Sequence, residues 1–83
     1  MYSIVFEKAA KKFIDRLPMP DRRRVATAIA QLPNGAGIKK LKGYAGLMRL
    51  RVGDYRIIYR VDNGRLVVLV VDAGNRGEIY KRY

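Results

Sequence analysis

The fold follows from residues 48–59, which read Met-Arg-Leu-Arg-Val-Gly-Asp-Tyr-Arg-Ile-Ile-Tyr. Apolar residues and arginines alternate on both sides of Gly53-Asp54, as expected of two half-buried strands. A glycine at the first central position of a two-residue loop is typical of a type II′ turn, whose twist suits a β-hairpin. Counting outward from this turn predicts that Arg51 faces Arg56, and it fixes the register of the whole hairpin.

The predicted hairpin has one apolar face and one cationic face, because successive side chains of a strand point to opposite sides. The apolar face comprises Met48, Leu50, Val52, Tyr55, Ile57 and Tyr59, and the cationic face comprises Arg49, Arg51, Arg56 and Arg60. Like charges that face each other across a ladder cost about 0.2–1 kcal/mol per pair. We therefore expect an anionic partner beside Arg51 and Arg56. The alternative is that these arginines only line the solvated side of a half-exposed sheet.

The composition predicts one small domain, residues 1–83, that binds polyanions. Eighteen Lys and Arg against seven Asp and Glu give a formal charge of +11. Such a charge favours nucleic acid, the ribosome, an anionic membrane surface or an acidic protein as partner. The chain has no His and no Cys, so we expect no disulfide, no metal and no cofactor. It also has no apolar segment near the roughly 20 residues of a membrane span and no signal peptide, so we expect a cytoplasmic protein without membrane association.

Two amphipathic helices are predicted before the hairpin. Apolar residues recur at helical spacing over residues 7–17 and again over residues 25–32; this spacing is typical of one buried helix face. Pro18-Met19-Pro20 separates the two helices, and Asp21 is expected to cap the second. Arg22-Arg23-Arg24 would then lie in its first turn, where the helix dipole disfavours cations. Either an anionic partner or solvent would stabilise them there.

One further strand is predicted after the hairpin. Asn63-Gly64 is a strong signal for a two-residue type I′ turn, and the six apolar residues Leu66–Val71 indicate an interior strand buried on both faces. Pairing across this turn sets Arg56 opposite Val71. With an opening strand at Tyr2–Phe6, the order predicts an α+β fold: an N-terminal strand, a two-helix hairpin and an antiparallel three-strand meander with the helices on one sheet face.

Residues 35–46 are expected to form a mobile basic loop that leads into the hairpin. They contain four glycines and the cluster Lys39-Lys40-Leu41-Lys42. These lysines could bind a phosphate backbone, but a lysine run in a loop is equally typical of a segment that is only solvated.

Three segments together resemble the RelE-like toxins of the RelE/ParE superfamily. They are Lys40-Leu41-Lys42-Gly43, residues 46–59, and Gly74-Asn75-Arg76-Gly77-Glu78-Ile79-Tyr80. The likeness spans nearly the whole chain and implies the RelE-like fold. It also implies a type II toxin: a metal-independent endoribonuclease, or mRNA interferase, that cuts messenger in the ribosomal A site. A small cognate antitoxin would neutralise it, and operator DNA would be bound only through the antitoxin complex.

The resemblance also implies a set of site residues. Catalytic roles are expected of Arg51, Arg56, Arg76 and Tyr80, and RNA binding is expected of Arg49, Lys39, Lys40 and Lys42. Many relatives carry His just before the final arginine, where this chain has Asn75. Any acid–base role of that His is therefore absent here.

Cleavage of RNA by the ribose 2′-OH requires cations at the phosphate, alignment and proton transfer. The guanidinium groups of Arg56 and Arg76 suit the phosphate because they are forked and always charged. Tyr80, with an ordinary pKa near 10, could donate a proton to the leaving oxygen, accept one from the 2′-OH, or stack on a base. Glu78 is the only nearby carboxylate, and we expect it to orient an arginine. Such an enzyme depends on electrostatics and alignment, and should be weak on free RNA.

Two other functions fit part of the sequence. A ParE-type toxin of the same superfamily would inhibit DNA gyrase, cut no RNA and have no need of Arg76 and Tyr80. A non-enzymatic basic RNA-binding module would rest on charge alone.

Overall fold

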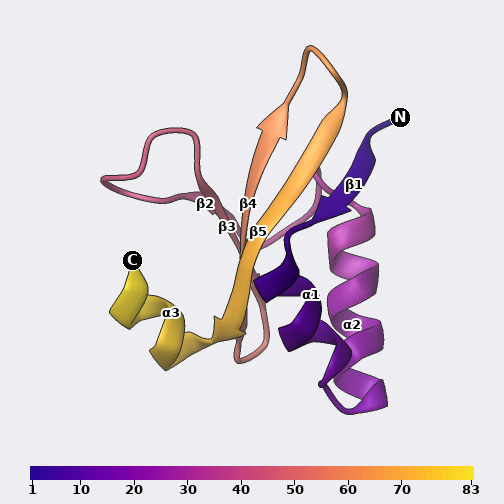
Figure 1. The fold of residues 1–83 in the computed structure, drawn as a ribbon, viewed down its shortest axis with the longest axis vertical. Helices are drawn as coiled ribbons and strands as arrows, with labels where there is room; N and C mark the ends of the chain where they lie inside the picture. The colour runs from indigo at the N-terminus through magenta and orange to yellow at the C-terminus, as the bar shows by residue number, and fades with distance from the viewer.

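The chain folds into a five-stranded sheet with helices on both faces (Figure 1). The computed structural model describes all of residues 1–83. The elements in chain order are β1 (Ser3–Phe6), α1 (Lys8–Asp15), α2 (Met19–Ala30), β2 (Ile38–Lys40), β3 (Met48–Val52), β4 (Tyr55–Asp62), β5 (Val67–Asn75) and α3 (Arg76–Arg82). The strand order across the sheet is β1-β5-β4-β3-β2. β1 pairs with β5 in parallel, and all other neighbours are antiparallel. No helix is long and apolar enough to cross a bilayer.

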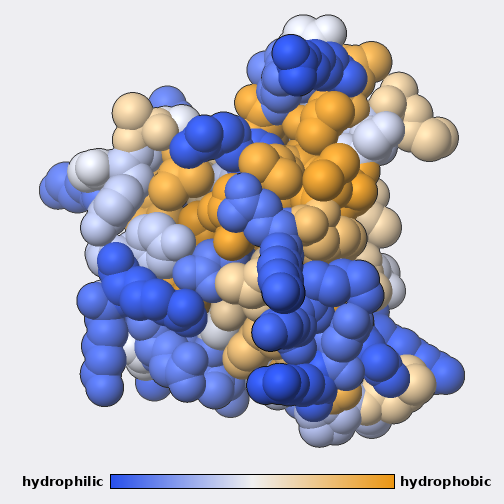
Figure 2. Space-filling view, viewed as in Figure 1, coloured by the Kyte–Doolittle hydropathy of each residue, from blue (hydrophilic) through white to orange (hydrophobic).

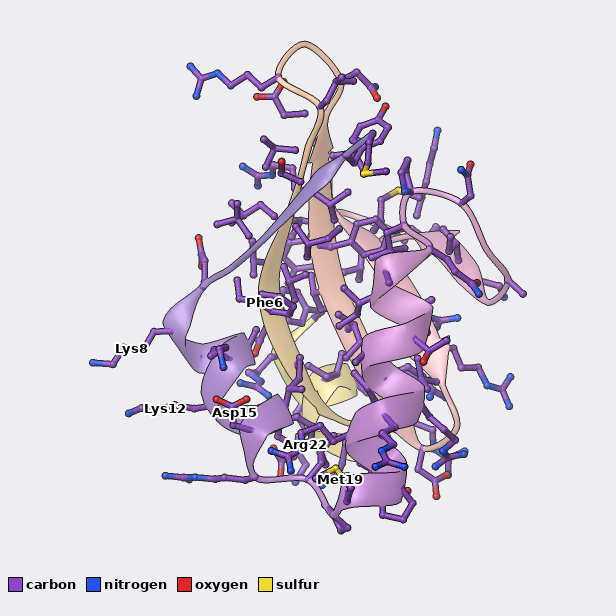
Figure 3. The ribbon with its side chains drawn as sticks, turned by 90° about the vertical axis from the view of Figure 1, so that its right-hand side faces the viewer. Phe6, Lys8, Lys12, Asp15, Met19 and Arg22 are labelled. Carbon is purple, nitrogen blue, oxygen red and sulfur yellow. The ribbon has the colours of Figure 1, made fainter.

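The predicted α+β architecture is confirmed, with α1 and α2 on one face of the sheet. The main core lies between these helices and the apolar face of β3, β4 and β5, and its buried residues are Ala10, Ile14, Val25, Ile29, Leu32, Leu50, Ile57, Tyr59, Val68, Val70 and Ala73. Outward from this layer, Lys8 and Lys12 point away from the sheet (Figure 3). The cationic face of the hairpin lies on the opposite side, where α3 covers part of it (Figure 1).

The β3–β4 hairpin has the predicted register. Arg51 pairs with Arg56, and the pairing continues outward to Met48 opposite Tyr59. Gly53 takes φ +57 and Asp54 does not have a positive φ, as a type II′ turn requires. The turn chemistry therefore fixes which side chains lie on each face.

The second hairpin differs from the prediction. Its loop covers residues 63–66, with Leu66 at φ +55 in place of a positive φ at Gly64. A bulge between Ile58 and Tyr59 shifts the ladder further. As a result Arg56 lies opposite Gly74, and the predicted partner Val71 is wrong. The four-residue loop and the bulge each place extra residues on the β5 side of the ladder. The predicted register assumed a two-residue turn and no bulge, so it paired Arg56 with a residue too early in β5.

The second helix begins earlier than expected. Pro18 is its N-cap and Met19 its first residue, so the prediction that Asp21 caps it is wrong. A proline is tolerated in a first helical turn because its missing N–H would have had no partner there. Asp21 instead accepts a hydrogen bond from the Tyr55 hydroxyl at 2.6 Å and pairs with Arg24 at 3.0 Å. The arginines of residues 22–24 accordingly follow the first turn.

Two elements were not predicted from the sequence. β2 occupies part of the expected mobile loop and pairs Lys39 with Arg49 at the edge of the sheet. α3 forms in a segment to which the sequence analysis assigned no element, and its Ile79 is 1% exposed. β5 is an interior strand, as predicted, but its second face is only half-buried at Val67 and Leu69.

Candidate functional site

Arg56 lies at the centre of the cationic face and is held by the hairpin turn. Its side chain is 3% exposed, and its Nη1 donates hydrogen bonds to the carbonyl oxygens of Gly53 at 2.8 Å and Tyr55 at 2.9 Å. Its Nε is buried without a hydrogen-bond partner. Such an unpaired buried donor is rare and costly in a folded protein, so this guanidinium is fixed in place with unused donor capacity.

Tyr80 projects from α3 over Arg56. The Arg56 Cζ lies 6.0 Å from the centre of the Tyr80 ring, and the Tyr80 side chain remains 55% exposed. The pKa of Tyr80 is lowered from its ordinary value of 10.0, chiefly because the Arg56 guanidinium can donate a hydrogen bond to the phenolate. The positive charges of Arg56, Arg49 and Arg76 lower it further, against an opposing effect of desolvation. The site therefore favours the anionic form of Tyr80.

A cavity of about 260 Å³ lies beside Tyr80, between α3 and the β2–β3 edge. Its lining residues are Lys39, Lys40, Leu41, Lys42, Arg49, Ile79, Tyr80 and Tyr83. The structure thus brings all four residues expected to bind RNA together with Tyr80. Arg49 is half-buried, and its Nε, like that of Arg56, has no partner. Arg76 joins the site through its backbone N–H, which donates to the Asp54 carbonyl oxygen at 2.9 Å and places the start of α3 at the hairpin turn.

Arg51 is exposed, pairs with Arg56 across the ladder and shares its face. No ion pair in the structure involves the four arginines of this face, Arg49, Arg51, Arg56 and Arg76. All five ion pairs are formed by other cations. Glu78 pairs with an arginine, as expected, but this arginine is Arg82, at 3.8 Å, and not one of the four on the cationic face. Four arginines without a carboxylate partner make the face suited to an anionic ligand.

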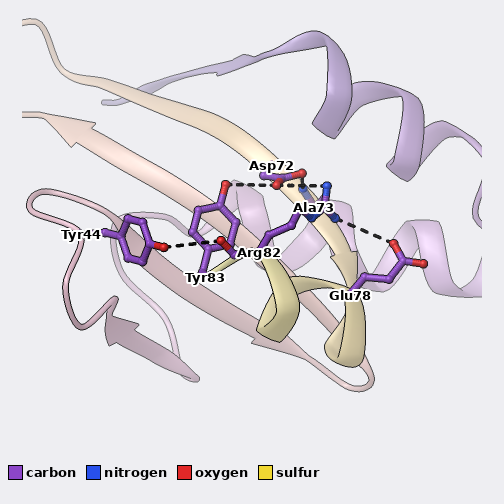
Figure 4. A network of polar contacts seen from close by, with 6 residues as sticks. All are labelled: Tyr44, Asp72, Ala73, Glu78, Arg82 and Tyr83. Carbon is purple, nitrogen blue, oxygen red and sulfur yellow. Dashed lines mark hydrogen bonds and ion pairs between the residues drawn. The ribbon is translucent and has the colours of Figure 1, made fainter.

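A second group of polar residues, which sequence reasoning missed, joins the end of α3 to β5 (Figure 4). Asp72 of β5 is 7% exposed. It accepts a hydrogen bond from the Tyr83 hydroxyl at 3.1 Å and pairs with Arg82 at 3.4 Å. The only signal in the sequence was a carboxylate directly after a run of apolar strand residues.

Apolar residues are gathered at the other end of the same sheet face. Figure 2 shows them around the upper part of β4 and β5, with hydrophilic residues covering most of the lower part. A shallow groove there is lined by Val5, Arg60, Asp62, Arg65, Val67 and Leu69. Ile58, which alternates onto the same face as Arg56 and Arg60, is fully buried, whereas Val67 and Leu69 are half-buried.

The chain is similar to known toxins along most of its length. A family described as "ParE toxin of type II toxin-antitoxin system, parDE" matches residues 4–80. Toxin RelG of Mycobacterium tuberculosis is 26% identical over 98% of both chains. Toxin RelE3 of Methanocaldococcus jannaschii is 31% identical over 77% of this chain and 81% of that protein. The crystal structure of the archaeal RelE–RelB complex from Pyrococcus horikoshii contains a chain with a TM-score of 0.77 at 30% identity, covering 92% of this chain and 96% of that one.

Proposed function

Because the chain belongs to the ParE toxin family of type II toxin–antitoxin systems, within the RelE/ParE superfamily, we propose that it is a ribosome-dependent mRNA endoribonuclease. One observation carries this proposal: Tyr80 lies over Arg56 on a face whose four arginines have no carboxylate partner. These groups match the needs of phosphodiester cleavage by the neighbouring ribose hydroxyl.

The arginines stabilise the charge that builds on the phosphate during the reaction. Arg56 is rigidly held by the turn carbonyls, so it needs little reorganisation when that charge develops. Arg49, Arg51 and Arg76 add further guanidinium donors around it.

Tyr80 acts as the base in this mechanism, because the surrounding cations favour its phenolate. The phenolate takes the proton of the 2′-OH while the 2′ oxygen attacks phosphorus in line. The bond from phosphorus to the 5′ oxygen breaks, and the leaving oxygen takes a proton from water. The products are a 2′,3′-cyclic phosphate and a 5′-hydroxyl end. Tyr80 then returns its proton to solvent.

The ribosome supplies the alignment that the protein lacks. Tyr80 is 55% exposed, so the reacting groups lie at the protein surface, where a flexible strand of free RNA keeps its freedom. Correct alignment of reacting groups is worth several orders of magnitude in rate. A messenger bent in the ribosomal A site would arrive already aligned, so the activity belongs in the cytoplasm, where translation occurs.

A cognate antitoxin is the second partner that we propose. The related archaeal toxin was solved in complex with its RelB antitoxin. The charge of +11 and the half-buried apolar groove of β5 on this chain would suit an acidic, partly apolar peptide. Operator DNA would be bound only through the antitoxin complex.

Translation extracts test the proposed activity. The protein is added to a programmed extract, and the messenger is mapped for new 5′ ends by primer extension. We expect new 5′-hydroxyl ends at ribosome-bound codons and little cleavage of the same RNA without ribosomes. A messenger that remains intact while translation stops would rule the nuclease out, and ribosome binding without cleavage would favour a plain RNA-binding module.

A gyrase-inhibiting toxin is the second candidate, because the matching family is described as a ParE toxin. It would leave RNA intact and block supercoiling of relaxed plasmid by purified DNA gyrase. Under our proposal, the protein leaves supercoiling unchanged at concentrations that cleave messenger on the ribosome.

A further inference from the structure

α3 cannot hold its position through its own helical structure. It has seven residues, well below the length at which an isolated helix is stable in water. Ile79 is its one fully buried side chain, and Tyr80 is 55% exposed. The orientation of Tyr80 over Arg56 therefore depends on contacts that tie α3 to the sheet.

The contacts at the start and middle of α3 hold Arg76 and Ile79 and do not involve the last turn. The Arg76 N–H donates to the Asp54 carbonyl oxygen and fixes the first residue. Ile79 packs over Gly74 so closely that a Cβ at Gly74 would lie 3.3 Å from the Ile79 Cγ1. Tyr80 lies beyond both contacts, in the turn that also carries Arg82 and Tyr83.

Asp72 of β5 restrains this last turn through its side chain. Its Oδ2 accepts a hydrogen bond from the Tyr83 hydroxyl at 3.1 Å and pairs with Arg82 at 3.4 Å (Figure 4). Its Oδ1 accepts a hydrogen bond from the Ala73 N–H at 2.9 Å, which holds the carboxylate itself. At 7% exposure, it binds both partners where water competes little.

The same last turn also contacts the loop between β2 and β3. The Tyr44 ring meets the Tyr83 ring edge-on at 5.3 Å, and the Tyr44 hydroxyl donates to the Arg82 carbonyl oxygen at 3.5 Å. Tyr44 belongs to the loop between β2 and β3, so a single turn of α3 joins β5 to that loop.

We propose that Asp72 is a positioning residue: by holding Arg82 and Tyr83 against β5, it fixes α3 so that Tyr80 stays over Arg56. The catalytic part of this role rests on the proposed nuclease function. The geometric part does not, because it concerns only where Tyr80 lies in the free protein.

Titration of Tyr80 separates a change in position from a change in charge. Without Asp72, a freed α3 would carry Tyr80 away from Arg56, and the pKa of Tyr80 would rise toward its ordinary value. Removal of a carboxylate alone has the opposite effect, because loss of a negative charge favours the phenolate and lowers the pKa. A rise therefore reports movement.

The experiment follows the tyrosines by NMR in protein labelled with ¹³C-tyrosine, with Tyr80→Phe identifying the Tyr80 signal. We expect the midpoint of Tyr80 to rise in Asp72→Ala, and to rise less in Asp72→Asn, which keeps an acceptor for the Tyr83 hydroxyl. Tyr83→Phe removes one hydrogen bond and keeps the ring contact with Tyr44, so it tests the same restraint in a chain that keeps Asp72. Thermal melts verify that each variant is folded.

Asp62→Ala is the matched control. It removes an exposed carboxylate that pairs with Arg65 at 3.8 Å at the opposite end of the sheet, and we expect it to leave the Tyr80 midpoint in place. An unchanged or lowered midpoint in both folded Asp72→Ala and folded Tyr83→Phe would overturn the proposal.

Single-turnover cleavage on programmed ribosomes gives the second measurement. We expect the rate at saturating ribosomes to fall about tenfold in Asp72→Ala with little change in the half-saturating concentration, since misplacement by an ångström costs up to roughly a hundredfold. A fall in rate with an unmoved Tyr80 midpoint would contradict the role in positioning. A raised midpoint in a protein that cleaves no messenger would keep the positioning role and reject the nuclease.

Discussion

Tyr80 differs from the other tyrosines whose pKa the fold changes. The pKa of Tyr55 is raised, chiefly by its hydrogen bond to Asp21, and the pKa values of Tyr59 and Tyr83 are raised chiefly by burial. Only the pKa of Tyr80 is lowered, by the arginines around it. The resemblance pointed to Arg56, Arg76 and Tyr80, but the lowered pKa depends on where α3 lies, which no local pattern predicts.

Replacement of Tyr80 by Phe tests whether its hydroxyl takes part in the reaction. We expect single-turnover cleavage on ribosomes to fall by roughly 10²–10⁴-fold, the usual contribution of a general acid or base. Ribosome binding should persist, because the ring that could stack on a base is kept. Cleavage at the rate of the unmodified protein would leave Tyr80 with a stacking role alone.

The pH dependence of cleavage follows from the same site. If the phenolate is the active form, the rate rises with pH and levels off above the pKa of Tyr80, which lies below its ordinary value of 10.0. Arg49→Gln removes one of the positive charges that lower this pKa, so the levelling-off should move to higher pH. A profile that falls as pH rises would instead assign Tyr80 the role of acid. The measurement is single-turnover cleavage across a pH series at constant ionic strength.

The elements that could be predicted are those whose signals lie within one hairpin or one helix. The β3–β4 register follows from Gly53, and the two long helices follow from apolar spacing. β2 has three residues, two of them lysines, and α3 has seven residues. β2 is held by pairing with β3, and α3 is held by packing on β5 and β4. Both are too short to show a periodic pattern of their own. The four-residue loop after β4 was missed because Asn63-Gly64 resembles a shorter turn.

Gly37 supports β2 through a close approach of two backbones. It takes φ +79, and a Cβ there would lie 2.9 Å from the Arg51 carbonyl oxygen. Gly43 also has a positive φ, +85, with open space around it. We expect Gly43→Ala to lower the free energy of unfolding by about 1 kcal/mol from backbone strain alone, and Gly37→Ala to lower it further. Urea denaturation of both variants measures the difference, and equal losses would contradict the steric contribution.

The hydrogen bond from Tyr55 to Asp21 joins β4 to α2, and it predicts a stability that depends on pH. Tyr55 is the main cause of a pKa of Asp21 below the ordinary 3.8, with Arg24 adding to it. A lowered pKa stabilises the fold above the ordinary value, and this contribution is lost as pH falls through the folded-state value. Tyr55→Phe should therefore be less stable than the unmodified protein at neutral pH, and the difference in stability should narrow as pH falls below the ordinary pKa of 3.8. Urea midpoints at pH 7 and pH 2.5 test this, and a constant gap would contradict it.

The whole molecule carries a charge of +11, so its association with ribosomal or messenger RNA should weaken steeply with salt. Each neutralised phosphate adds about 0.7 to the slope of log affinity against log salt for a single strand. Replacement of Lys39, Lys40 and Lys42 by Gln should reduce the slope by about 2 if all three bind phosphates. The saturated cleavage rate should change far less than the affinity. Equilibrium binding to ribosomes across a salt series measures this slope. A slope that the replacement leaves unchanged would show that these lysines are only solvated.

The parallel pairing of β1 with β5 has a consequence for a protein that would attack the machinery that makes it. Residues 3–6 are synthesised before their ladder partners, residues 67–70, and α3 follows those partners. The first strand of the nascent chain therefore stays unpaired until residues 67–70 are made, because contacts so distant in sequence form only when both segments are present. Arg49, Arg56 and Tyr80 cannot meet before α3 is made, so under the proposed function the nascent chain has no assembled site until that point.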